Sequence, residues 1–336
     1  MRRLAPWIVC FGIALAGCTD TVAPVPAAPK ALPPGFGPMP HPEDNQPTES
    51  RIQLGRLLFH DQRLSSDGSV SCASCHQADY AFADHQPVSV GVFGRRGTRN
   101  APSLMNVGYR PHFMREGAVP TLEMQVLVPI QEHAEFDMNI LDVAARLGAD
   151  SALQQLSREA YDRSIDPYVV TRALAAYQRT LVSSGSRYDH FVRFNDPAYL
   201  TDAERRGMSI FFDQRAACAE CHAPPHFTTF GFANNGLYAS TRDRGRARLT
   251  GRAEDDAVFS IPSLRNSAVT APYMHDGSVI NLKRVLQHYN DGGAGHPNQD
   301  HRIRTLGLTE QELLDLEAFL RSLTDAEFIH SPALRK

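Results

Sequence analysis

Two short motifs hold the most chemically distinctive residues of this chain. Both have the pattern C-x-x-C-H, and they run from Cys72 to His76 and from Cys218 to His222. Two thiols at this spacing can add across the vinyl groups of a haem, and the histidine that follows becomes an iron ligand. A redox dithiol needs no such histidine, and a zinc site would need both cysteine pairs to meet at one ion. The motifs therefore predict two covalently bound haem c groups. The attachment residues are Cys72, Cys75, Cys218 and Cys221, and the first axial ligands are His76 and His222.

The first eighteen residues are typical of an exported bacterial protein. Arg2 and Arg3 precede a short apolar run, and Leu15-Ala16-Gly17-Cys18 resembles a lipobox, in which the cysteine becomes lipidated. A simple cleaved signal with an incidental cysteine is the alternative. We expect residues 1–18 to be a lipoprotein signal peptide of a Gram-negative bacterium. Lipid on Cys18 would hold the mature protein on a membrane, in the periplasm, without spanning the bilayer.

Length, charge and composition limit the remaining possibilities. The chain has 336 residues, 42% of them hydrophobic, and a formal net charge of -3. This length suggests about two domains, and the near-neutral charge gives no sign of nucleic-acid binding. Between Thr19 and Pro47 the chain is rich in proline and has no apolar periodicity, which predicts a tether over residues 19–45. Folded structure is expected to begin near Gln46 to Arg51.

Helical patterns surround both motifs. The segment from Thr201 to Glu204 is a capping box for a helix that ends just before the second motif, and Thr309 to Glu312 begins another helix. Residues 141–156 and 168–182 also read as helices, whereas strand signals are sparse. We therefore expect a mainly α fold, with two cytochrome-c-like helical haem domains and long loops. The predicted domains are an N-terminal peroxidatic haem c domain over residues 46–185 and a C-terminal electron-transfer haem c domain over residues 186–336.

Several further segments resemble the bacterial di-haem cytochrome c peroxidase and MauG family, across nearly all of residues 46–325. Besides the two C-x-x-C-H motifs, they are Gly55 to Phe59, Arg63 to Ser65, Arg99 to Leu104, Ile261 to Asn266 and Thr270 to Ser278. The resemblance implies a haem-dependent peroxidase. Hydrogen peroxide would react at the first haem, and electrons would pass through the second.

The resemblance also implies a distal pocket over the first haem. Family members place a Gln and a Glu there, ten residues apart with a Pro between them, and Gln125, Pro129 and Glu135 keep this spacing. A carboxylate over an open iron can take a proton from peroxide and return it to the departing oxygen. Gln125 can hydrogen-bond to the peroxide. Glu132 and His133 are nearby competitors for the catalytic role, and we expect both at the surface.

Position 92 bears on whether the first haem is open. Family peroxidases that need activation carry a blocking histidine eight residues before the Asn of the Arg-Asn-Ala-Pro segment, and counting back from Asn100 gives Val92. Valine cannot ligate iron, and His85 would need a different loop path to reach it. The resemblance therefore implies a five-coordinate or water-bound first haem that accepts peroxide without prior reduction.

The sixth ligand of the second haem is a Met in the peroxidases of the family and a Tyr in the MauG-like enzymes. It stands seventeen residues after the Pro of the Pro-Tyr-x-His-Asp-Gly segment, which makes it Tyr289 here. A phenolate stabilises the higher oxidation states of iron better than a thioether does. Met274, His288 and His275 are the alternative ligands.

Family members hold a calcium ion between their haems. The corresponding positions are Asn100, which would ligate through its side chain, and Thr270 and Pro272, which would ligate through backbone carbonyls. An all-oxygen shell of this kind suits calcium.

One position departs from the family. A Trp normally stands between the haems, ten residues before the distal Gln, as a relay for oxidising equivalents, and Arg115 takes its place here. Either another aromatic residue replaces the relay, or the haems couple directly. The aromatic candidates are Tyr109, Phe113 and Tyr273. The Arg115 guanidinium could instead pair with haem propionates.

Three functions are consistent with these features. Tyr289, the missing blocking histidine and the lipid anchor favour a MauG-like enzyme that oxidises a side chain of a partner protein. The stretch from Arg115 to Glu123 is similar to the MbnH-like subgroup associated with methanobactin operons, whose members oxidise a Trp on a copper-binding partner. The alternative enzyme is a peroxidase that detoxifies hydrogen peroxide with electrons from a small cytochrome c. The third function is that of a non-enzymatic electron carrier with both haems fully ligated. In such a protein Gln125 and Glu135 would have no catalytic role.

Overall fold

The computed structural model describes residues 32–335, so the predicted signal peptide and the lipidation site at Cys18 lie outside the described residues. Helices dominate this range. Its strands are β1 (Phe232–Ala233) and β2 (Phe259–Ser260), which pair antiparallel with Phe232 opposite Ser260. The predicted mainly α fold is confirmed. Within residues 32–335, none of the helices combines the length and the hydropathy needed to span a bilayer.

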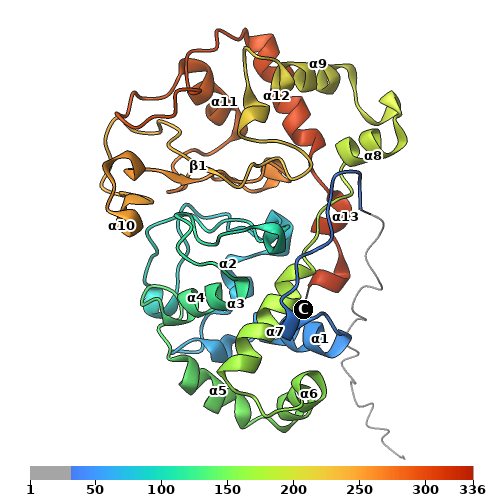
Figure 1. The fold of residues 1–336 in the computed structure, drawn as a ribbon, viewed down its shortest axis with the longest axis vertical. Coiled ribbons are helices and arrows are strands. Elements are labelled where there is room, and N and C mark those ends of the chain that lie inside the picture. Colours follow the sequence, from blue (N-terminus) through green and yellow to red (C-terminus); the bar gives the residue numbers. More distant parts are fainter. Residues whose placement is uncertain (1–31, 336) are drawn as a thin grey trace, which may run out of the picture.

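The helices divide between a lower and an upper half of the molecule (Figure 1). The lower half contains α1 (Glu49–Phe59), α2 (Cys72–Cys75), α3 (Leu122–Gln125), α4 (Leu127–Gln131), α5 (Ile140–Gly148), α6 (Ser151–Tyr161) and α7 (Pro167–Arg179). The upper half contains α8 (Arg187–Phe194), α9 (Asp202–Phe212), α10 (Ala247–Thr250), α11 (Leu282–Asp291) and α12 (Glu310–Ser322). The chain then returns downward through α13 (Ala326–Ile329). Short 3₁₀ turns lie in the loops, among them Val92–Gly94 and Cys218–Glu220.

Local capping sets several of the helix ends. Both predicted capping boxes are present, since the hydroxyls of Thr201 and Thr309 accept the backbone N–H groups at the third positions of α9 and α12. The predicted helix over 141–156 is wrong in one respect, because it is divided into α5 and α6. The Asp150 carboxylate accepts the first backbone N–H groups of α6, which starts a new helix at this point.

The two halves repeat one helix crossing. In the lower half α1 crosses α7, and a Cβ added to Gly55 would lie 1.9 Å from the backbone oxygen of Ala173. In the upper half α9 crosses α12, and a Cβ added to Gly207 would lie 1.9 Å from the backbone oxygen of Asp315. Only glycine permits such a close approach of two helix backbones.

Aromatic rings pack next to both crossings in the same way. The ring centroids of Phe59 and Tyr177 are 5.1 Å apart with an interplanar angle of 57°, and those of Phe211 and Phe319 have the same separation and angle. Each phenylalanine follows its glycine by four residues. The repeated geometry gives each half its own hydrophobic core, and each core lies beside one C-x-x-C-H motif.

The end of the chain packs on the first core. Phe328, Ile329 and Leu334 belong to the core of the lower half, and the Tyr177 hydroxyl donates to the backbone oxygen of Leu334 at 3.0 Å. The C-terminus accordingly lies beside α1 (Figure 1). The tail of the predicted second domain, residues 186–336, therefore packs on the core of the lower half.

The proline-rich segment before α1 is also packed rather than free from Pro33 onward. The Phe36 ring contacts the rings of Tyr109 and His226 at 5.8 and 4.6 Å between centroids. Asn45 is fully buried and donates to the Glu123 carboxylate at 2.8 Å. Residues 33–45 of the predicted tether over 19–45 are thus attached to both halves by these side chains, and residues 19–31 lie outside the described residues.

Candidate functional site

Each motif histidine has one ring nitrogen fixed by a backbone carbonyl. His76 Nδ1 lies 2.9 Å from the Phe82 oxygen, and His222 Nδ1 lies 3.2 Å from the Phe227 oxygen and 3.1 Å from that of Pro262. Burial lowers the pKa of both histidines, that of His222 to about 4, so both are neutral at pH 7. An imidazole that donates through Nδ1 keeps the lone pair on Nε2 free, which is the usual arrangement of a metal-bound histidine.

The motif thiols are unsuited to redox exchange. Burial raises the pKa of Cys72 to about 12, that of Cys75 to about 11 and that of Cys218 to about 12. Reactive dithiols instead have lowered pKa values, because the thiolate is the nucleophile. All four motif cysteines are free of disulfides. Buried protonated thiols beside a neutral histidine fit covalent attachment of a haem in both halves.

The structure brings Glu135 to the first motif. Glu135 follows α4, and its carboxylate contributes to the raised pKa of both the Cys72 and the Cys75 thiol. Glu135 is an exposed residue, as Glu132 and His133 are, but the surrounding protein partly desolvates its carboxyl group. This burial, with a smaller contribution from Glu132, raises the pKa of Glu135 to about 7. A carboxyl group that titrates near neutral pH can both accept and return a proton.

Gln125 ends α3, and its side-chain amide lies 3.9 Å from the Met114 sulfur. The competitors of Glu135 lie at the surface, as expected. His133 has 69% of its side chain exposed and contacts Asp137 at 3.2 Å, and Glu132 is exposed as well.

The loop around Val92 lies directly against Glu135. Val92 is fully buried, and its backbone N–H donates to the Glu135 carbonyl oxygen at 3.0 Å. His85 is exposed, stacks on Tyr80 at 4.9 Å between ring centroids, and lies 3.3 Å from the Gln77 amide. Neither of the two positions considered for a blocking ligand therefore offers a buried imidazole to the first pocket.

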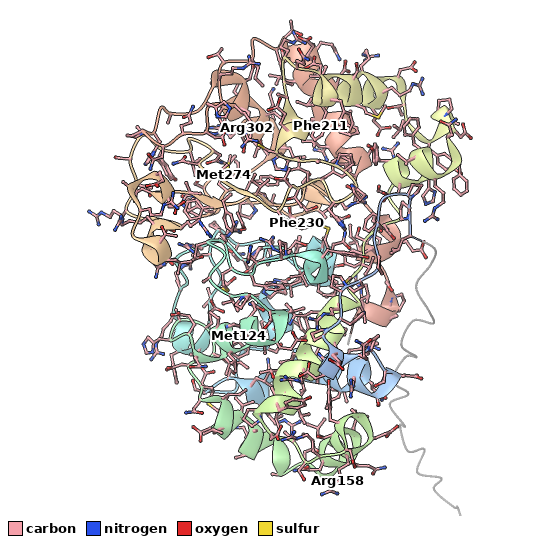
Figure 2. The ribbon with its side chains drawn as sticks, viewed as in Figure 1. Met124, Arg158, Phe211, Phe230, Met274 and Arg302 are labelled. Atoms are coloured by element: carbon pink, nitrogen blue, oxygen red, sulfur yellow. The ribbon has the colours of Figure 1, made fainter. Side chains whose placement is uncertain are left out.

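A cavity of about 300 Å³ lies beside the second motif. Cys218, Cys221, His222 and Tyr289 all line it. Burial raises the pKa of Tyr289, and both motif cysteines contribute to this shift, so the phenol lies close to them. Figure 2 shows three further lining residues in the upper half, namely Phe211, Met274 and Arg302. The size and lining of the cavity fit a haem held by the second motif.

The alternatives to Tyr289 are engaged by other groups. His288 Nε2 lies 2.9 Å from the backbone oxygen of Asn235. The Asn235 side-chain amide donates to the Met274 sulfur at 3.2 Å. The His275 ring stacks on Phe259, with centroids 4.2 Å apart and an interplanar angle of 15°.

The predicted calcium ligands Asn100, Thr270 and Pro272 line the same cavity. Arg115 lies against the first of them: its guanidinium donates to the Asn100 backbone oxygen at 2.7 and 3.1 Å, and to its side-chain oxygen at 3.1 Å. Burial, with a smaller effect of Arg99 and Arg110, lowers the pKa of Arg115 to about 10. The uncharged oxygens of Asn100 and the buried guanidinium of Arg115 are therefore in contact at the predicted calcium site.

The aromatic candidates for the missing Trp lie in different places. Tyr273 lines the cavity and donates its hydroxyl to the Ser267 oxygen at 2.7 Å. Tyr109 packs on His226, with ring centroids 4.5 Å apart, and Phe113 is buried in the first core.

Sequence reasoning missed Asn235 and Met114. An internal repeat could have revealed Met114, because Phe113-Met114-Arg115-Glu116-Gly117 matches Tyr273-Met274-His275-Asp276-Gly277. The structure gives both segments the same form. Phe113 pairs with Val119 and Tyr273 with Val279 in isolated bridges, and both methionines have positive φ. Asn235 has no comparable signal, since it lies in a loop far from the other pocket residues in sequence.

The fold and the two C-x-x-C-H motifs define a di-haem c-type protein, and comparisons with known proteins agree. The family model for di-haem cytochrome c peroxidase matches residues 49–196. The methylamine utilization protein MauG of Methylorubrum extorquens is 36% identical over 289 residues, which cover 85% of this chain and 81% of that protein. The cytochrome-c peroxidase IdrP1 of a Pseudomonas species is 31% identical, over 93% and 89% of the two chains.

Solved structures show the same relationship. A MauG-like protein associated with microbial copper homeostasis superposes with a TM-score of 0.87 at 34% identity, and covers 92% of this chain and 99% of its own. The di-haem peroxidase BthA of Burkholderia thailandensis has a TM-score of 0.73 at 25% identity, over 85% and 88% of the two chains. This chain belongs to the di-haem cytochrome c peroxidase and MauG family, and it is a haem-dependent peroxidase with two haem c groups.

Proposed function

We propose that this protein is a MauG-like peroxidase that uses hydrogen peroxide to oxidise a side chain of a partner protein. The observation that carries the peroxide chemistry of this proposal is the position of Glu135. This carboxyl group lies near the first motif and has a pKa of about 7, and the loop beside it holds Val92 where a blocking histidine would stand.

The proposed chemistry at the first site depends on proton transfer by this chain. A haem held by Cys72, Cys75 and His76 would supply the iron at which hydrogen peroxide gains two electrons and becomes water. The ionised Glu135 accepts the proton of the nearer peroxide oxygen and then returns it to the departing oxygen, which leaves as water. The Gln125 amide orients the peroxide by a hydrogen bond. Two oxidising equivalents and the second peroxide oxygen remain. The partner's side chain supplies the two electrons that remove the oxidising equivalents, and with two protons this oxygen also becomes water.

Tyr289 supports a protein substrate rather than a small cytochrome. As the second ligand of the haem held by His222, it would supply an anionic oxygen, which favours higher oxidation states of iron. A thioether ligand would instead keep this haem at the high potential suited to accepting electrons from a cytochrome. We therefore assign the storage of oxidising equivalents to the Tyr289 pocket.

Calcium is part of the proposal. Asn100 would supply its side-chain oxygen, and Thr270 and Pro272 their backbone oxygens, with waters to complete the shell. The Arg115 guanidinium shares the Asn100 oxygen, so it competes electrostatically with the ion. Binding is therefore expected to be weaker than these oxygens would give alone.

The proposed location is the periplasmic side of a membrane, with lipid on Cys18 as the anchor. The resemblance to a MauG-like protein associated with copper homeostasis suggests that the partner is a copper-binding protein. Cytochrome-c peroxidase activity is the second candidate, because relatives of that name align with more than nine-tenths of this chain.

One experiment separates the two candidates. Purified holoprotein is treated with hydrogen peroxide and then offered either reduced cytochrome c or a copper-binding partner protein. Mass spectrometry of the partner should show an aromatic residue oxidised by two electrons, with one oxygen gained from water and two protons released, while the oxidation of cytochrome c stays slow. Rapid, catalytic oxidation of cytochrome c without change in the partner would overturn the proposal.

A further inference from the structure

Asn235 contacts two of the alternative ligands of the second haem, Met274 and His288. Its side-chain amide donates to the Met274 sulfur at 3.2 Å, and its backbone oxygen lies 2.9 Å from His288 Nε2. Its side chain also lies close to the Tyr289 phenol: burial raises the pKa of this phenol, and the Asn235 side chain opposes that shift. Asn235, Met274 and Tyr289 all line the cavity of the second motif.

Asn235 is itself fixed in place. It follows β1, and its side-chain oxygen accepts the Leu237 backbone N–H at 3.2 Å. With the oxygen engaged, the NH₂ group is the end that faces the sulfur and the phenol, and it has two N–H donors to share between them. The pairing of β1 with β2 holds this loop beside the cavity.

We propose that Asn235 selects the axial ligand of the second haem. Its amide occupies the sulfur of Met274 and positions the oxygen of Tyr289, and its backbone carbonyl keeps Nε2 of His288 away from the iron. Asn235 is thus a positioning residue that acts through Tyr289. This inference rests on the proposed ligation by Tyr289.

The lower half contains a related arrangement. Met114 is the counterpart of Met274 in the internal repeat, and the Gln125 amide lies 3.9 Å from its sulfur. In both halves a side-chain amide therefore faces the repeat methionine. In the lower half no tyrosine ligand comparable to Tyr289 is expected. An amide that occupies the Met114 sulfur would therefore leave the iron of the first haem open.

Asn235→Leu tests the proposal, because leucine has a similar volume but cannot donate a hydrogen bond. The variant keeps the backbone carbonyl that holds His288. Loss of a hydrogen bond of ordinary strength should raise the ratio of sulfur-bound to tyrosine-bound second haem about tenfold. The readouts are the sulfur-to-iron charge-transfer absorption, the electron paramagnetic resonance (EPR) spectrum of the resting ferric holoprotein and the reduction potential of the second haem, which should rise.

Two further variants make the result interpretable. In Asn235→Leu/Met274→Leu no sulfur is available, so the sulfur-bound species should disappear and the EPR spectrum should return to that of the single Met274→Leu control. A double variant that stays as perturbed as Asn235→Leu would mean general disruption of the pocket and would overturn ligand selection. An Asn235→Leu spectrum identical to that of the wild type would overturn it as well.

Tyr289→Phe distinguishes failure of this inference from failure of the proposed function. If Tyr289→Phe alters the second haem while Asn235→Leu does not, Tyr289 is the ligand and only the role of Asn235 is lost. If Tyr289→Phe leaves the spectrum of the second haem unchanged, the proposed ligation itself fails, and the role of Asn235 fails with it.

Discussion

The backbone N–H of Val92 donates a 3.0 Å hydrogen bond to the carbonyl oxygen of Glu135. The loop position that blocks the haem in activation-dependent peroxidases thus supports the backbone of the proposed acid–base residue in this chain. Val92 is fully buried in the first core, so the contact is held by packing as well as by the hydrogen bond. The loop at position 92 and the backbone of Glu135 are therefore held together in one contact.

Glu135→Gln should slow the reaction of the holoprotein with hydrogen peroxide by about 10²- to 10⁴-fold, the usual contribution of a positioned proton-transfer group. The amide matches the carboxyl group in size but cannot take up the proton. Stopped-flow absorbance of the haem bands measures the rate constant. Glu132→Gln is the matched control, because Glu132 is a nearby exposed carboxylate, and it should react at the wild-type rate. Equal rates in Glu135→Gln and the wild type would remove Glu135 from the mechanism.

The rate constant should also depend on pH through Glu135. Its pKa of about 7 lies above the usual value because burial disfavours the charged form. The ionised form is the base, so the rate should reach a plateau above about pH 8 and fall about tenfold per pH unit below about pH 6. Rate constants measured across this range in the wild type should show an inflection near pH 7 that Glu135→Gln lacks. An inflection retained in Glu135→Gln would assign the titration to another group.

The resting ferric holoprotein should contain one high-spin and one low-spin haem. Val92 cannot ligate iron and His85 is held at the surface beside Tyr80, so the first haem should keep an open position. EPR spectroscopy measures the two populations, and added azide should convert the high-spin signal first. Two purely low-spin signals before azide is added would contradict an open first site.

Arg115→Leu should strengthen calcium binding at least about tenfold, because it removes a buried positive charge that shares the Asn100 oxygen with the ion. Isothermal titration of calcium-depleted holoprotein measures the affinity. Arg115→Lys keeps the charge and should bind calcium about as weakly as the wild type. If Arg115→Leu and Arg115→Lys bind calcium equally, the guanidinium does not compete with the ion.

Asp189→Asn should destabilise the upper half by about 3–5 kcal/mol, because it leaves Arg265 as a buried charge without its partner. The two side chains are 2% and 1% exposed and their charged atoms are 2.7 Å apart. Thermal unfolding measures the loss. Glu317→Gln breaks a partly exposed pair with Arg321, in which the arginine is 58% exposed, and should cost no more than about 1 kcal/mol.

This ion pair also gives a pH test. Arg265 lowers the pKa of Asp189, so the stabilisation is present above the unfolded-state pKa and is lost as pH falls through the folded-state value. The gap in thermal midpoint between the wild type and Asp189→Asn should therefore narrow in acid, below about pH 4. A gap that stays constant down to pH 2 would show that the charge of Asp189 is not responsible.

Much of the fold could be predicted because its signals are local. The capping boxes at Thr201 and Thr309 and the two C-x-x-C-H motifs depend on residues within a few positions of one another. The misplaced features involve distant contacts. The backbone oxygen of Leu334, near the end of the chain, accepts a hydrogen bond from Tyr177 in the first core. Asn45, in the segment expected to be a tether, donates a hydrogen bond to the Glu123 carboxylate. No local pattern encodes such contacts, since they depend on which surfaces meet after folding.

The sequence by itself determined the covalent chemistry of this protein, because thioether attachment and the first axial ligand need only residues that are adjacent in the chain. The tertiary structure decided what surrounds each histidine. It desolvates Glu135 beside the first motif, places the Arg115 guanidinium on Asn100, and brings the Asn235 amide to the Met274 sulfur from a separate segment. Burial and the distances between side chains set the pKa values and determine which groups can ligate iron. Burial and these distances arise only when the chain has folded.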